Sequence, residues 1–166
     1  KYIYMTTKKT GANKVAKPIR KKTTPVKKAS ATEVLKGVPD IRRFFYKNET
    51  PLYFISATNF NMLGADEWIK GFKFICHIEC FDGLHPNVFS PKHEIPHDEF
   101  TCIEDINNYL LQHPEVQAYL NTRKKGKSAG KAMFLMFDET TERLAKKLGL
   151  QIMFPPAKMR TLMDNK

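Results

Sequence analysis

The chain has 166 residues, enough for one domain with a tail. Hydrophobic residues make up 42% of the chain, which excludes a wholly disordered protein, and no apolar run approaches the ~20 residues of a membrane-spanning helix. The three cysteines are too few for a disulfide framework, so the composition indicates a reducing compartment, the cytoplasm.

The net charge of +11 is concentrated at the N-terminus. Ten of the 28 Lys and Arg residues, and none of the 17 Asp and Glu residues, lie in residues 1–30. Residues 31–166 are therefore nearly neutral. Because like charges repel and the apolar residues of this segment follow neither a helical nor a strand period, we expect residues 1–30 to be a disordered tail. Residues 31–166 are predicted to fold as one domain.

The basic tail has two interpretations. Its lysines could make a salt-sensitive, sequence-independent contact with nucleic acid or another polyanion. Alternatively, the tail is a solubilising leader with no specific partner. Residues 6–30 contain no aromatic side chain that could stack on bases, which favours the second interpretation.

The folded part begins with a predicted helix from Pro39 that packs Ile41, Phe44 and Phe45 inward. An uninterrupted apolar run then predicts a buried strand over 51–57. The next segment, 58–63, is polar and turn-like, and its candidate site residues are Thr58, Asn59 and Asn61. A short helix is predicted over 64–70, with its acidic residues early, where the helix dipole favours them.

A second strand is predicted over 72–81, followed by a long loop over 82–98 that is rich in proline, glycine and histidine. Asp82 and His85 are the candidate site residues of this loop. Residues 100–103 are predicted to form a short third strand. Helical spacing then predicts helices over 105–112 and 115–122, the second starting at Pro114.

A basic loop over 123–131 leads to a predicted strand over 132–137. Asp138 and Thr140 open a helix that ends at Gly149, which stands in the usual glycine position after a helix. A strand over 150–154 and a helix over 157–163 complete the pattern.

Strands that alternate with helices predict an α/β fold, here a three-layer Rossmann-like domain with a mainly parallel sheet. Ligands of such sheets bind outside the carboxyl ends of the strands. The candidate substrate-side residues in the loops that follow the strands are Thr58, Asn59, Asn61, Asp82, His85, Asp138 and Thr140.

Metal and phosphate motifs are weak in this sequence. Cys76 and Cys80 would lie about 13 Å apart on one strand, at ~3.3 Å per residue, too far for one zinc ion. The histidines of the 82–98 loop could serve a metal or acid–base chemistry, or could simply be solvated. The basic loop has the order Gly126-Lys127-Ser128 but lacks the earlier glycine of a phosphate-binding loop. We therefore expect no metal site.

The C-terminal quarter carries a resemblance. The strand AMFLMF is followed by DETTE, by a helix ending in Leu148-Gly149-Leu150, by Pro155-Pro156 and by LMDNK at residues 162–166. This order is similar to the end of the N-terminal (pre-ATP-grasp) domain of ATP-grasp ligases of the biotin carboxylase-like group. The pattern departs from that family at Asn165, which stands between Asp164 and Lys166, and at the first strand, which no glycine-rich turn follows.

The resemblance implies that the chain is the leading, substrate-side domain of an ATP-dependent carboxylate–amine or related ligase that acts through an acyl-phosphate. Lys166 would contact the phosphates of ATP. Magnesium-ATP and the catalytic groups would be bound by an ATP-grasp domain beyond residue 166, so that this segment alone would hold no cofactor and be inactive. The alternative from the residues themselves is a stand-alone α/β binding module whose basic tail contacts nucleic acid.

Overall fold

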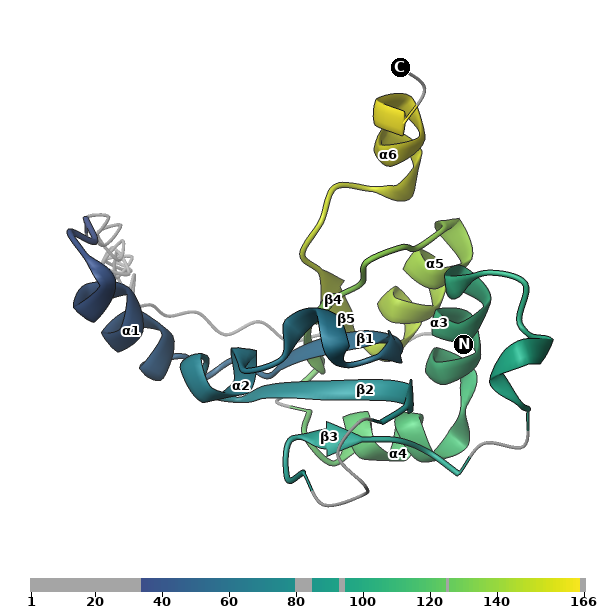
Figure 1. Cartoon of the computed structure of the whole chain (residues 1–166), viewed down its shortest axis with the longest axis horizontal. Coiled ribbons are helices and arrows are strands. Elements are labelled where there is room, and N and C mark those ends of the chain that lie inside the picture. Colours follow the sequence, from purple (N-terminus) through teal and green to yellow (C-terminus); the bar gives the residue numbers. More distant parts are fainter. Residues whose placement is uncertain (1–33, 80–84, 93–94, 125, 165–166) are drawn as a thin grey trace, which may run out of the picture. The chain divides into compact units, whose positions relative to one another are not determined.

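The computed structural model describes residues 34–79, 85–92, 95–124 and 126–164. The chain divides into two units, Lys1–Val34 and Leu35–Lys166, and every element below belongs to the second (Figure 1). The predicted tail, residues 1–30, lies outside the described residues. Among the residues that are described, no helix is long and apolar enough to cross a bilayer.

The strands are β1 (Leu52–Thr58), β2 (Phe72–Ile78), β3 (Val88–Phe89), β4 (Gly130–Met133) and β5 (Leu150–Ile152). The α-helices are α1 (Val38–Tyr46), α2 (Ala65–Trp68), α3 (Ile103–Gln112), α4 (Pro114–Asn121), α5 (Glu139–Leu148) and α6 (Ala157–Asp164). Two short 3-10 helices are η1 (Phe60–Met62) and η2 (His97–Glu99).

The five strands form one sheet in the order β3-β2-β1-β4-β5, and every neighbouring pair is parallel. Leu52 of β1 pairs with Phe72 of β2 on one side and with Lys131 of β4 on the other. Helices flank the sheet. The prediction of a Rossmann-like α/β fold with a parallel sheet is thus confirmed.

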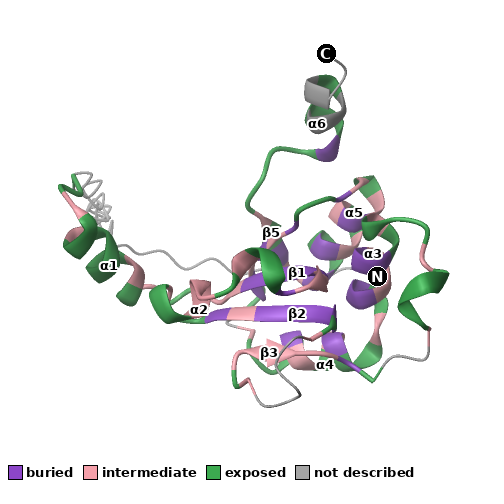
Figure 2. Ribbon diagram, in the orientation of Figure 1, coloured by how far each residue is buried: buried purple, intermediate pink, exposed green. Residues whose placement is uncertain are grey.

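The core has two parts because alternate side chains of a strand point to opposite faces. On one face, Tyr53, Ile55 and Ile75 pack with apolar residues of α3, α4 and α5. On the other face, Phe54, Phe72 and Phe74 form a smaller cluster, against which η1 and α2 pack. Figure 2 shows β1 and β2 as largely buried, as expected for central strands covered on both faces.

The third strand differs from the prediction. Residues 100–103 are not a strand, since Phe100 follows η2 and Ile103 begins α3. The third strand is β3, inside the segment predicted as loop, where Val88 and Phe89 pair with Phe74 and Ile75. Two residues at a sheet edge carry too little periodicity to be recognised from sequence, and pairing with β2 decides their conformation.

The fourth strand begins and ends earlier than predicted, at Gly130–Met133 instead of 132–137. Gly130 adopts φ +124° and lies against β1, where an added Cβ would stand 2.4 Å from the Pro51 carbonyl oxygen. Phe134 and Phe137 follow the strand as buried loop residues with ring centroids 6.0 Å apart. Their apolar character reflects core packing in the turn and not strand pairing.

Helix α1 forms where it was predicted, but its apolar side chains are not packed inward. Ile41 is 36% exposed and Phe44 55% exposed, while Phe45 is half-buried. The helix is held by polar contacts with α2: the Tyr46 hydroxyl donates to the Glu67 carbonyl, and the Arg42 guanidinium lies 5.0 Å from the Trp68 ring centroid. The amphipathic spacing therefore indicates the helix correctly and its burial wrongly.

Candidate functional site

The carboxyl ends of β1 and β4 define the candidate site. The chain leaves β1 for β2 on one side and later returns to β4 on the other, so the connections diverge between these two adjacent strands. In doubly wound sheets a ligand crevice forms at this divergence. The segments that leave it are η1 with its flanking residues and the turn between β4 and α5 (Figure 1).

The structure brings five of the predicted site residues to this edge. Thr58 is the last residue of β1, Asn59 is buried at the start of η1, and Asn61 is exposed within η1. Asp138 and Thr140 begin α5 after the neighbouring strand β4. Because β1 and β4 are parallel, both segments emerge at the same edge of the sheet.

Asp138 is the N-cap of α5. Its Oδ1 accepts a hydrogen bond of 2.7 Å from the Thr141 backbone N–H, and its own N–H donates to the Thr141 hydroxyl at 3.4 Å. Burial acts to raise the pKa of the Asp138 carboxyl, but hydrogen bonds from Thr141 and Asn108 outweigh burial, and the pKa lies below its ordinary value. The carboxylate therefore stays ionised and positions the turn, and it is poorly suited to proton transfer.

Two asparagines of α3 complete this support, and the sequence reasoning missed them. Asn107 is fully buried and donates from Nδ2 to the Met136 carbonyl at 2.7 Å. Asn108 donates from Nδ2 to the Asp138 carboxylate at 3.3 Å and accepts from the Thr141 hydroxyl at 2.8 Å. The available signal was an amide at position 107, which shares the inward spacing of Ile106 and Leu110 and so needs a buried partner.

Thr140 has a more modest role. Its hydroxyl accepts a hydrogen bond of 3.0 Å from the Arg143 guanidinium within the first turn of α5. Its side chain is half-buried, like that of Thr58, whereas Asn61 is exposed. Thr58, Asn61 and Thr140 are therefore the predicted residues at this edge with polar groups accessible to a ligand.

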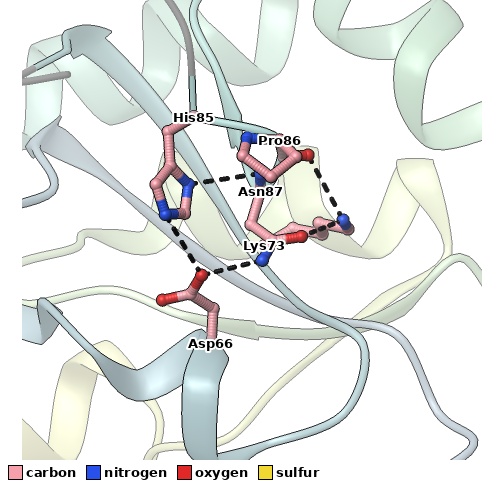
Figure 3. Close-up of polar contacts among 5 residues, drawn as sticks. All are labelled: Asp66, Lys73, His85, Pro86 and Asn87. Carbon is pink, nitrogen blue, oxygen red and sulfur yellow. Dashed lines mark hydrogen bonds and ion pairs between the residues drawn. The ribbon is translucent and has the colours of Figure 1, made fainter.

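His85 lies elsewhere, in the network drawn in Figure 3. Its Nε2 is 3.5 Å from Asp66 Oδ2, and the same carboxylate oxygen accepts from Asn87 Nδ2 at 2.7 Å. The Lys73 ammonium donates to Asn87 Oδ1 and to the Pro86 carbonyl. Since Asn87 precedes β3 and its carbonyl accepts from Phe74 N near the start of β2, this network lies toward the amino ends of the strands. The structure thus does not bring His85 to Thr58 and Asp138.

Two predicted residues, Asp82 and Lys166, lie outside the described part of the chain. Cys80 also lies outside it, while Cys76 is buried in β2.

The described residues do not fit magnesium-ATP. Within the described ranges no group of three or more His, Cys, Asp or Glu side chains could hold a metal ion. The Asp138 carboxylate is occupied by its own helix and by Asn108, and the turn after β1 has no glycine before Gly64. Two cavities lined by described residues, of about 400 and 580 Å³, include none of the predicted site residues. We therefore derive no catalytic step through ATP.

Large apolar side chains are exposed along the carboxyl edge. Phe60 and Leu63 follow β1 and are 61% and 50% exposed. Leu135 and Met136 follow β4, and Met153 and Phe154 follow β5, all between 41% and 47% exposed. These side chains follow three adjacent strands at one edge of the sheet. Exposed apolar side chains that gather on one surface mark places that another domain or a ligand covers.

Comparisons with known proteins give no relative for this chain: no family model, no curated protein and no solved structure matches it. The fold and the geometry of the carboxyl edge therefore carry the functional argument.

Proposed function

We propose that this chain is the leading, substrate-side domain of an ATP-dependent ligase that joins a carboxylate to an amine or a related nucleophile. The observation that carries the proposal is the exposed apolar edge beyond β1, β4 and β5, at the divergence point of a parallel sheet. A leading domain of such an enzyme needs this edge for its catalytic neighbour, the ATP-grasp domain of the same polypeptide. The C-terminal pattern through residues 162–166 supports the same assignment.

In this proposal the residues of the edge bind substrate and do not transform it. Thr58, Asn61 and Thr140 offer hydroxyl and amide donors, which suit the oxygen atoms of a small carboxylate. Asp138, Asn107 and Asn108 position the turn after β4. ATP, magnesium and the catalytic charges belong to the neighbouring domain, and Lys166 contributes one cation toward the phosphates.

A stand-alone binding module is the second candidate, because ten basic residues and no acidic residue lie in residues 1–30. Such a tail supplies sequence-independent affinity for nucleic acid. It leaves the apolar carboxyl edge without an explanation, and we therefore rank it second.

The parent reading frame separates the two candidates. The ligase proposal expects the coding sequence to continue past Lys166 for a domain-sized stretch, roughly 200 residues, with glycine-rich strands and paired acidic or amide magnesium ligands. A stop codon directly after Lys166 would favour the binding module.

The reaction class is then tested on the protein expressed from its complete reading frame. We expect carboxylate-dependent release of ADP, and trapping of an activated acyl group as a hydroxamate when hydroxylamine replaces the amine. Asn61→Ala should raise the KM for the carboxylate, because it removes an exposed donor without disturbing the cap at Asp138. A lower maximal rate of ADP release with an unchanged KM for the carboxylate would contradict the role assigned to Asn61.

A further inference from the structure

A hollow lies at the edge of the sheet opposite the candidate site, where β1 and β2 begin. It has a volume of about 400 Å³, and its lining includes Glu49, Thr50, Tyr53, Lys70, Lys73 and Arg123. These residues come from the segment before β1, from β1 itself, from the turn before β2 and its first residues, and from the segment just after α4. The hollow shares no residue with the carboxyl-edge site.

Tyr53 lines this hollow and, within the described part of the chain, carries a hydroxyl without a hydrogen-bond partner. Its side chain is fully buried, and among the described residues its Oη has no hydrogen-bond partner. Burial, followed by the nearby Tyr119, raises the pKa of Tyr53 to about 12, although Arg123 acts to lower it. The hydroxyl therefore remains protonated and is a donor without an acceptor, which is costly in a buried position.

The charged side chains around this hydroxyl are mainly cationic. Lys70, Lys73 and Arg123 line the hollow, and Glu49 is the acidic residue among its described lining residues. Burial and then the positive charge of Arg123 lower the pKa of Lys73, although the Asp66 carboxylate acts to raise it. Cations close enough to disfavour one another's charge create a positive potential that an anion would relieve.

Arg123 is held in place with part of its guanidinium available. The guanidinium carbon lies 3.7 Å from the centroid of the Tyr119 ring, and Nη1 donates to the Tyr119 carbonyl at 3.3 Å and to the Thr122 hydroxyl at 3.2 Å. Both of these hydrogen bonds use Nη1. Among the described residues no hydrogen bond uses Nε or Nη2, so these two donors remain for a ligand. A stacked guanidinium with free donors matches the paired oxygens of a carboxylate or phosphate.

We propose that this amino-edge hollow binds a small ligand through an oxyanion, either a phosphate or a carboxylate group, which accepts from the Tyr53 hydroxyl and the Arg123 guanidinium. Lys70 and Lys73 add charge at longer range. The volume suits a small metabolite. The site is separate from the proposed function, and its test does not depend on ATP or on a further domain.

The test is a titration of the full chain with inorganic phosphate and, separately, with succinate, followed by two-dimensional amide NMR at constant ionic strength made up with chloride. We expect saturable shifts at the amides of Thr50, Gly71 and Arg123. Tyr53→Phe should weaken binding by about fivefold, because it removes one hydroxyl donor and no charge. Arg123→Gln should weaken it by about tenfold or more.

The control is Arg43→Gln, which makes the same charge change on the exposed helix α1, where Arg43 makes an ion pair of 3.6 Å with Asp40. Arg43→Gln should leave the affinity for phosphate and succinate unchanged. The basic tail is identical in every variant, so any binding by the tail contributes equally to all of them. Saturation by phosphate alone, by succinate alone or by both supports the site and identifies the group it takes. Shifts confined to residues 1–30, or equal weakening by Arg43→Gln and Arg123→Gln, would overturn the proposal. Because Arg123 is exposed, its variant remains informative even if Tyr53→Phe impairs folding.

Discussion

At the scale of single residues, Asp138 connects three elements through one carboxylate. It caps α5 through the Thr141 amide, accepts from Asn108 of α3, and ends the turn that leaves β4. Its neighbour Asn107 fixes the same turn by donating to the Met136 carbonyl. The shape of the carboxyl edge next to β4 thus depends on a few polar contacts and not on the apolar side chains exposed there.

Asp138→Ala should lower the free energy of unfolding by about 1 kcal/mol at neutral pH, the usual cost of losing an N-cap acceptor. The pKa of Asp138 is depressed in the folded state, so this contribution is present above the pKa of the unfolded chain and is lost as the pH falls through the folded-state pKa. Urea denaturation at neutral pH and at about pH 3 measures both effects.

Asp138→Asn is the matched control, because asparagine keeps the cap acceptor and lacks the charge. We expect a smaller loss than for alanine at neutral pH. An alanine variant with an unchanged unfolding free energy would show that the cap does not stabilise α5.

At the scale of elements, the junction between α5 and β5 depends on Gly149. This residue has φ +80°, and an added Cβ would lie 2.5 Å from the Lys127 carbonyl oxygen. Gly64, before α2, has almost the same backbone conformation, φ +81°, with nothing within 4 Å of the added atom. Comparing alanine variants at these two glycines therefore separates the cost of the left-handed backbone conformation from the cost of the close contact with Lys127.

Gly64→Ala should cost about 1 kcal/mol of stability, the penalty of a left-handed conformation for a residue with a side chain. Gly149→Ala should cost at least about twice as much, because the backbone near Lys127 must also move. Thermal denaturation of the two variants side by side measures the difference, and equal losses would mean that the close approach at Gly149 carries no energy.

Local patterns were sufficient for most elements. Proline at the start of α4, the acidic cap of α5 and the glycine after it mark their helices because each acts within one turn of chain. Strand β3 and the true start of β4 were not predictable, since pairing with β2 and the close approach of Gly130 to Pro51 are contacts between distant segments.

The candidate site was predictable where its residues depend on local sequence, and not where they depend on contacts between distant segments. Residues that directly follow a parallel strand, such as Thr58 and Asp138, reach the carboxyl edge once the strand is placed. His85 follows β2 by a long connection that passes to the amino end of β3, and its place depends on contacts with Asp66 and Asn87. The amino-edge hollow was not predicted because its cations come from two segments about 50 residues apart, the start of β2 and the chain after α4.

At the scale of the whole molecule, the positive charge is concentrated in residues 1–30, while residues 31–166 are nearly neutral. The composition of residues 1–30 predicts a disordered tail, and disordered chain is cleaved far faster than a packed core. We therefore expect brief trypsin digestion to remove residues 1–30 and leave a stable fragment covering about 31–166. Mass spectrometry of the resistant fragment checks this. Rapid loss of the entire chain would contradict the division.

In the proposed function, the chain supplies one side of an ATP-dependent site and not the ATP site itself. The most direct measurement is calorimetric titration with magnesium-ATP of residues 1–166 and of the protein from its complete reading frame, at a salt concentration that suppresses binding by the basic tail. We predict that only the complete protein binds, and that Lys166→Ala weakens its affinity by about tenfold or more while leaving its folding unchanged. Equal ATP affinity of the two proteins, or no ATP binding by the complete one, would contradict the account.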